Sequence, residues 1–324
     1  MPRFAATLLA VCAAGLIAVP GPAHAQPARP ADRNFWDWVS DPNSREIAAV
    51  MQPVQQILGL TRDEPLDGPG AAAARKLLQD AYGMLRYARS LEPDRYDVLF
   101  SLAEVADLLG RTDTAIDALE HGLATAPEEH QTYDARLRLG LLYAERGDLD
   151  RAVTELRIAI GEAPPGMLTY ARALPALAGV YMEQGQLDSA IDALEASDRT
   201  TARLFDGNLM IPLSLAVAYD RDDQRSRAYG VLAKLTQADR MVERLLRSSH
   251  GGLGAVRFVD PRERHYYVAL LCEATGMLDE ARAEWLAYAS ASPHSRYAAR
   301  ARAHARDILT LLRKQPAAPA KEKQ

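Results

Sequence analysis

Residues 139–156 have the sequence LGLLYAERGDLDRAVTEL, and this stretch decides the fold. It places a small residue, Gly140, after a large aliphatic one, a second glycine, Gly147, seven residues later, and an alanine, Ala152, five residues beyond that. Glycine accepts the left-handed backbone that ends a helix, and small residues let two helices approach closely. The stretch therefore predicts two antiparallel helices joined by a tight turn.

The same pattern occurs five times along the chain. Each copy opens with an aliphatic residue followed by a small one: Leu102-Ala103, Leu139-Gly140, Leu177-Ala178, Leu215-Ala216 and Val268-Ala269. The turn positions hold Gly110, Gly147, Gly185, Asp223 and Gly276, and the later alanines are Ala115, Ala152, Ala190, Ala228 and Ala281. Each helical hairpin leaves apolar surface that only the next one can cover, so the units must stack.

This unit resembles the tetratricopeptide repeat, a helix-turn-helix unit of about 34 residues. The resemblance covers residues 96–293 and implies an all-α, right-handed superhelical solenoid of antiparallel helix pairs. The last two alanines are 53 residues apart, which predicts an insertion at about residues 237–263. Pro175 predicts a late start or a kink in the first helix of its unit, whereas Pro212 suits a helix that begins near it.

Around this array the chain divides into further segments. Residues 44–95 are expected to form N-terminal helices, with one over 44–58 kinked at Pro53 and a long one over 71–91 that repeats the second half of a unit. Residues 96–313 hold the five units, the insertion and a capping helix over 295–312. The insertion is expected to extend a helix through Leu246 and then form a glycine-containing loop. Residues 314–324 are rich in proline, alanine and charge, which predicts a disordered tail.

The N-terminus has the layout of a secretory signal peptide over residues 1–25. Arg3 precedes an apolar run from Phe4 to Val19, and Ala23-His24-Ala25 supplies a small-residue cleavage site. A membrane anchor is the alternative, but the run is shorter than the roughly 20 residues that a span needs. Export with removal of the peptide is favoured over a membrane anchor. A periplasmic location is favoured over secretion from the cell.

The two cysteines bear on anchoring and redox state. Cys12 raises the alternative of a lipid-anchored protein, but it follows Val11, where such signals usually have a small residue. Without Cys12 the mature chain has Cys272 alone, so no intramolecular disulfide can form. The net charge of −5 gives no support to nucleic-acid binding. Basic residues are mostly arginine and alanine is abundant, a composition common in GC-rich bacteria.

The sequence shows no catalytic constellation. It lacks G-x-S-x-G, H-E-x-x-H and a phosphate-binding loop. Asp220 to Asp223 resemble a calcium loop in acidity alone. His265, beside two tyrosines, could bind a ligand, but it falls at a packing position, as do Cys272 and Trp285. We therefore expect no enzyme activity, no cofactor and no metal.

The family resemblance implies that the first helices of successive units line a concave binding face. Carried onto this chain, its acidic positions are Asp97, Glu104, Asp107, Asp134, Glu145, Glu183, Asp220, Glu263 and Glu273. Its apolar positions are Phe100, Leu108, Leu137, Leu141, Met182, Met210, Leu213, Val217, Tyr266 and Leu270. Its basic positions are Arg172 and Arg221. Apolar residues surrounded by acidic ones suit the binding of a basic, partly apolar protein segment. The alternative interpretation is that these acids are only the solvent-exposed face of amphipathic helices. The positions that would clamp a terminal carboxylate offer no cation.

A second candidate surface is the aromatic segment Phe35-Trp36-Asp37-Trp38-Val39, within residues 26–43. It could dock a partner or a membrane interface, but a lid packed on the first helices is preferred. Together these features predict a non-catalytic protein-binding scaffold of the bacterial cell envelope. The alternative is a helical accessory subunit of an envelope enzyme, such as a cell-wall or polysaccharide machine, with active residues in 250–267.

Overall fold

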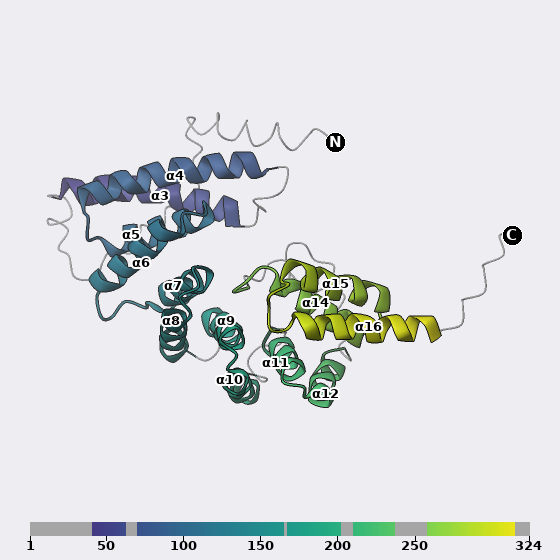
Figure 1. The fold of residues 1–324 in the computed structure, drawn as a ribbon. Coiled ribbons are helices and arrows are strands. Elements are labelled where there is room, and N and C mark those ends of the chain that lie inside the picture. Colours follow the sequence, from purple (N-terminus) through teal and green to yellow (C-terminus); the bar gives the residue numbers. More distant parts are fainter. Residues whose placement is uncertain (1–40, 63–69, 165–166, 202–209, 237–257, 315–324) are drawn as a thin grey trace, which may run out of the picture. The chain divides into compact units, whose positions relative to one another are not determined.

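The computed structural model describes residues 41–62, 70–164, 167–201, 210–236 and 258–314. Within these ranges every regular element is an α-helix, and there is no strand (Figure 1). The predicted all-α class is therefore confirmed. Several predicted features lie outside the described residues. They are the predicted signal peptide with Cys12, the aromatic segment with Phe35, Trp36 and Trp38, most of the predicted insertion, and the predicted tail.

The chain divides into two compact units, Met1–Thr125 and Ala126–Gln324. The first contains α3 (Pro42–Arg62), α4 (Ala71–Leu91), α5 (Tyr96–Leu108) and α6 (Thr112–Thr125). The long helix has the predicted bounds, because its buried residues recur every three or four positions along one face: Ala74, Leu78, Ala81, Leu85 and Ala88. Helix α3 is longer than predicted and runs through Pro53. It packs against α4, so the predicted half repeat has a partner helix.

The described residues of the second unit form four helical hairpins and a further helix (Figure 1). The pairs are α7 (Tyr133–Glu145) with α8 (Leu149–Glu162), α9 (Leu168–Gln184) with α10 (Leu187–Thr201), α11 (Met210–Arg221) with α12 (Arg225–Thr236), and α14 (Glu263–Ala274) with α15 (Leu278–Ala291). The further helix is α16 (Ala298–Lys314), which packs against α15. It supplies the predicted cap.

The turn between the two helices of each predicted unit has the expected left-handed backbone. Positive φ angles occur at Gly110 (70°), Gly147 (83°), Gly185 (78°), Asp223 (58°) and Gly276 (76°). After Gly147, the Asp148 amide donates to the Tyr143 carbonyl at 2.9 Å and so satisfies an acceptor at the helix end. Asp223 is followed by the same bond, from the Gln224 amide to the Tyr219 carbonyl at 2.8 Å. Aspartate tolerates this conformation better than most non-glycine residues.

Small residues bring the two helices of a pair together. The alanines at 115, 152, 190, 228 and 281 all have an exposed fraction of 0%. At Gly140, a Cβ atom would lie 2.7 Å from Cγ of Leu156 and 3.3 Å from the backbone oxygen of Ala152. The close approach of α7 and α8 therefore depends on the absence of a side chain at position 140.

Proline affects the helix starts less than the sequence predicts. Helix α9 begins at Leu168 and continues through Pro175 to Gln184, so of the two predicted effects the late start is wrong, and a kink at Pro175 stays a prediction. Leu174 and Ala178 are buried on either side of the proline, and this burial offsets the missing backbone hydrogen bond. Pro212 is the third residue of α11, in the first turn, where its missing N–H has no helical acceptor, as predicted.

Candidate functional site

In the second unit, the first helices of the pairs lie against one another in sequence order. Contacts join α7 to α9, α9 to α11, and α11 to α14. These helices carry most of the residues predicted to form the concave binding face. The structure places these residues in two different environments. Most of those on α11 and α14 are covered by other side chains, whereas most of those on α7 and α9 are at least partly exposed.

On α11 and α14 the predicted residues are buried. The exposed fractions are 0% for Leu213, Val217, Asp220, Tyr266 and Leu270, 6% for Arg221 and 8% for Glu263. The structure therefore brings these residues together in the core of the second unit and not on an open face. Met210, at the start of α11, is half-buried and packs against the same core.

Two side chains of α16 fill the acidic part of this site. Arg300 donates to both carboxylate oxygens of Asp220, at 2.9 and 3.0 Å, and also pairs with Asp223. His304 lies 3.2 Å from Asp220 through Nε2 and 2.9 Å from Glu273 through Nδ1. The Tyr266 hydroxyl donates to Asp220 at 2.7 Å. The buried carboxylates are thus fully partnered by residues of the same chain.

The electrostatics of this cluster follow from burial and pairing. Burial alone lowers the pKa of His304, but hydrogen bonds to Asp220 and Glu273 outweigh it and raise that pKa to about 9. Burial alone raises the pKa of Asp220, but hydrogen bonds from His304 and Arg300 hold it well below its usual range. The same balance lowers the pKa of Glu273. At neutral pH the cluster therefore holds an imidazolium between two carboxylates.

An aromatic cage surrounds the second basic residue of the site. The Arg221 guanidinium lies 4.4 Å from the Tyr266 ring centre and 4.1 Å from that of Tyr297, and it pairs with Glu263. The Tyr297 hydroxyl donates to the backbone carbonyl of Met182, at the end of α9, at 2.8 Å. Tyr297, just before α16, therefore ties together three of the first helices.

Tyr297, Arg300 and His304 were not among the residues predicted to form the site. They are spaced three and four residues apart, so they lie on one face of the helix. That face also carries Ala301 and Ala305, which are buried. The sequence does carry a signal for them. Arg300 and His304 fall on the apolar face of the predicted capping helix, which indicates that acidic side chains are buried against that face.

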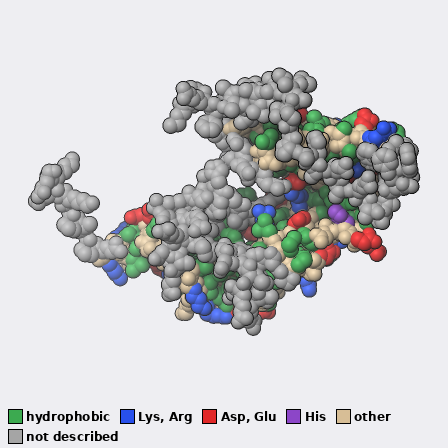
Figure 2. Space-filling view, turned by 180° about the vertical axis from the view of Figure 1, so that it is seen from behind, with side chains coloured by type: hydrophobic (Ala, Val, Ile, Leu, Met, Phe, Trp, Pro, Cys, Tyr) green, Lys and Arg blue, Asp and Glu red, His purple; other side chains and the backbone are tan. Residues whose placement is uncertain are grey.

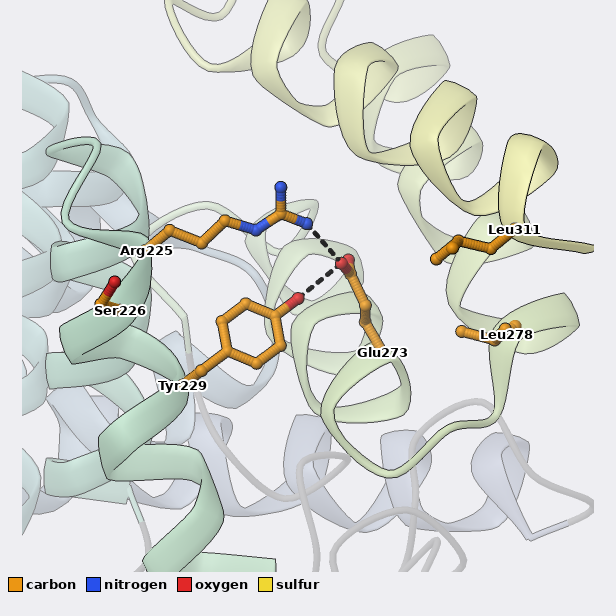
Figure 3. Close-up of a pocket in the computed structure, with 6 residues that line it drawn as sticks. All are labelled: Arg225, Ser226, Tyr229, Glu273, Leu278 and Leu311. Atoms are coloured by element: carbon orange, nitrogen blue, oxygen red, sulfur yellow. Dashed lines mark hydrogen bonds and ion pairs between the residues drawn. The ribbon is translucent and has the colours of Figure 1, made fainter.

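A shallow pocket of about 480 Å³ adjoins this cluster, between α12, α14, the start of α15 and the end of α16 (Figure 3). Tyr229 and Arg225 both donate to Oε1 of Glu273, the arginine at 3.0 Å. Oε2 of Glu273 is bonded by Trp285 and His304. With both carboxylate oxygens occupied, Glu273 is a structural anchor, and Figure 3 shows the aliphatic side chains of Leu278 and Leu311 on the other side of the pocket.

On α7 and α9 the predicted face is more open. Asp134, Glu145 and Arg172 are exposed, and Leu141 and Glu183 are half-buried. Leu137 and Met182 are buried, with exposed fractions of 7% and 1%.

Two acids on these helices have neighbours within the same unit. Asp134 accepts a hydrogen bond from the Thr169 hydroxyl. Burial, followed by repulsion from Glu263, raises the pKa of Glu183. The exposed acids at this end are Asp134 and Glu145.

In the first unit, the predicted residues on α5 are all half-buried: Asp97, Phe100, Glu104, Asp107 and Leu108. The Arg95 side chain donates to Asp97 at 2.9 Å. The Phe100 ring packs edge-on to Tyr96, with ring centres 6.0 Å apart. A Cβ at Gly122 would lie 2.7 Å from the Phe100 ring, so this ring seals the contact between α5 and α6.

Charged side chains do not gather into a single field on the face drawn in Figure 2. Among the side chains coloured there, red and blue ones are interspersed with green ones.

The residues considered for chemistry have packing partners. His265 is half-buried, with Nδ1 2.6 Å from Glu284. Trp285 is buried and stacks on His304, with ring centres 4.4 Å apart. Burial raises the pKa of the Cys272 thiol to about 11, so it is protonated and unreactive at neutral pH. No group of three potential metal ligands is assembled among the described residues. No helix in the described ranges is long and apolar enough to cross a bilayer.

Comparison with known proteins places a repeat on α7 and α8. A family model described as "Tetratricopeptide repeat" matches residues 134–165. Among solved structures, PilF of Pseudomonas aeruginosa is 16% identical, covering 82% of this chain and 99% of its own, with a TM-score of 0.49. MamA is 20% identical, covering 53% and 94%, with a TM-score of 0.46. YrrB, described as having an unusual peptide-binding site, is 15% identical, covering 62% and 93%, with a TM-score of 0.44. A search of curated proteins found no match.

Proposed function

We propose that this chain, a tetratricopeptide-repeat protein, is a non-catalytic scaffold that binds segments of other proteins in the cell envelope. Stacked helix pairs supply extended surface rather than a closed pocket, which suits binding better than catalysis. The observation that carries the proposal is the contrast between two parts of one predicted face. Asp220 on α11 is buried, Glu273 on α14 is half-buried, and both are bonded to residues of α16, whereas Asp134 and Glu145 on α7 are exposed.

The binding surface that we propose lies on α7 and α9. On α7, Leu141 is half-buried, Glu145 one turn later is exposed and Leu137 one turn earlier is buried. On α9, Arg172 is exposed. A partner segment would place an apolar side chain against Leu141 and a basic group near Glu145. Apolar anchors flanked by charge are typical of peptide grooves.

The chemistry of that partner is suggested by the chain's own α16. Three residues at the start of α16 or just before it contact the predicted face: an aromatic residue, an arginine and a histidine. They are Tyr297, Arg300 and His304. This intramolecular contact supports a basic segment with an apolar anchor as the partner. On α5, Glu104 and Asp107 occupy the corresponding positions of the first unit and would favour the same sign of charge.

The experiment that tests this surface is crosslinking in living cells. A photoreactive amino acid replaces Leu141 in one strain and Asp192, which is exposed on α10, in a control strain. We expect a crosslinked partner from position 141 and none from position 192. In the crosslinking strain, Glu145→Lys should abolish the product, whereas Asp192→Lys should not. Equal yields from both positions, or a yield insensitive to Glu145→Lys, would exclude this surface.

The envelope location has a separate test. The arrangement Ala23-His24-Ala25 supports cleavage before Gln26. Mass spectrometry of the protein recovered from fractionated cells should give a chain that begins at Gln26, in the periplasmic fraction. A chain that retains Met1 in the cytoplasm would exclude export, and a lipid-modified cysteine would indicate the lipoprotein alternative.

A further inference from the structure

The outward face of α16 is basic. Arg302, Arg306, Arg313 and Lys314 are exposed, and Asp307 is the one exposed acid of this helix. At about 100° per residue, the three arginines lie within roughly 40° of one another around the helix axis. The buried residues Ala298, Ala301, Ala305 and Ile308 face the core on the adjoining side of the helix. The three arginines therefore form a straight stripe along the solvent side.

These arginines differ from the other charged residues near them. Arg300 is paired with Asp220 and Asp223. Asp307 is paired with Arg225 at 3.6 Å, so the one acid on this side of α16 is already neutralised. In the described part of the chain, no carboxylate forms an ion pair with Arg302, Arg306 or Arg313. The positive charge of the stripe is thus left uncompensated on a chain whose net charge is −5.

We propose that this stripe binds the surface of a membrane that contains anionic phospholipids. A guanidinium group matches a phosphate with two parallel hydrogen bonds, and the stripe carries arginine at all three aligned positions. Leu311, with an exposed fraction of 51%, lies on the opposite side of the helix and lines the pocket, so the contact with the membrane is electrostatic. The helix lies on the membrane and does not enter its core, because its apolar face is already buried against the protein.

A lipid surface fits this stripe better than an acidic protein does. The exposed positions beside the stripe hold Ala299 and Thr310, and Leu309, which lies in line with the arginines, is half-buried, so the stripe has no exposed aromatic or large aliphatic anchor for a protein interface. Ion pairs between two exposed protein surfaces contribute little individually. A membrane surface needs no complementary shape, and each basic residue near it strengthens binding about fivefold. Three arginines therefore contribute roughly 100-fold.

The test is sedimentation of the purified protein with vesicles of phosphatidylcholine alone or with about 30% phosphatidylglycerol. The variant carries Arg302→Glu, Arg306→Glu and Arg313→Glu. The control carries Arg75→Glu, Arg157→Glu and Arg264→Glu, three exposed arginines on three other helices, and so has the same net charge. Thermal unfolding of both variants should match that of the unsubstituted protein, since all six positions are exposed.

We expect the unsubstituted protein and the control to bind the anionic vesicles, and the α16 variant to bind at least about 100-fold more weakly. Replacing the same three arginines with lysine should retain most of the binding, and raising the salt concentration should weaken it. Binding to neutral vesicles at equal strength, or equal loss in the control, would overturn the proposal. So would a stripe-dependent interaction with polyglutamate but none with anionic vesicles, which would indicate an acidic protein partner. None of these results depends on the surface of α7 and α9.

Discussion

At the scale of single residues, two helical glycines have opposite requirements. Gly140 lies where α7 meets α8, and a Cβ there would be 2.7 Å from Leu156. Gly230 lies inside α12, and a Cβ there would meet nothing within 4 Å. We expect Gly140→Ala to lower the free energy of unfolding by about 1–3 kcal/mol through overpacking. Gly230→Ala should raise it by roughly 0.5–1 kcal/mol, because alanine has the higher helix propensity.

Urea denaturation followed by circular dichroism measures both changes. The two variants serve as controls for each other, since the chemical change is the same. Destabilisation of similar size in both would mean that the packing at Gly140 is not what limits the substitution.

His304 makes the stability of the second unit depend on pH. Its pKa is about 9 in the folded protein and near 6.5 when unfolded. Because the folded value is the higher one, the stabilisation is fully present below pH 6.5 and is lost as pH rises through about 9. We expect the free energy of unfolding to fall by on the order of 3 kcal/mol between pH 6.5 and pH 9.5. His304→Gln, measured in the same denaturant series, should flatten this dependence, and an unchanged slope would contradict the assignment.

At the scale of helices, α16 is held by charge as much as by apolar contact. Arg300 supplies two hydrogen bonds to Asp220, which has an exposed fraction of 0%. We expect Arg300→Ala to cost about 1.5–3 kcal/mol, because Asp220 loses hydrogen bonds from a charged donor but keeps those from His304 and Tyr266. Arg302→Ala, two residues along the same helix and exposed, should change stability by less than about 0.5 kcal/mol. Chemical denaturation followed by Trp285 fluorescence would show both, and similar values for the two would contradict the role of Arg300.

The helices themselves could be predicted where the signal is local. The bounds of α4, the five left-handed turns and the five buried alanines follow from residues close together in sequence. The course of α9 through Pro175 could not be predicted, since it depends on burial of Leu174 and Ala178 by other helices. The acids of the candidate face were found, but their pairing was not. Asp220 and Arg300 are 80 residues apart, and no periodic pattern relates them.

At the scale of the whole second unit, bonds reach beyond neighbouring helix pairs. In a simple repeat array each unit contacts only its neighbours. Here Tyr297 bonds to the carbonyl of Met182, two helix pairs earlier. We expect Tyr297→Phe to weaken this link by about 1 kcal/mol, which corresponds to roughly fivefold faster hydrogen exchange. The effect should appear in the last turn of α9 and be absent from α7, and exchange measured by mass spectrometry would locate it. Faster exchange confined to α15 and α16 would contradict the link.

The bond between Tyr297 and Met182 also sets an order for folding. The two residues are 115 positions apart, so the end of α9 lacks this partner until Tyr297 has been made. Helices α7 and α8 can pair as soon as they emerge, because their contacts are local. The region from α9 onward has a high contact order, and its folding is correspondingly slower. The helices from α9 onward thus stay open to chaperones until Tyr297 has been made.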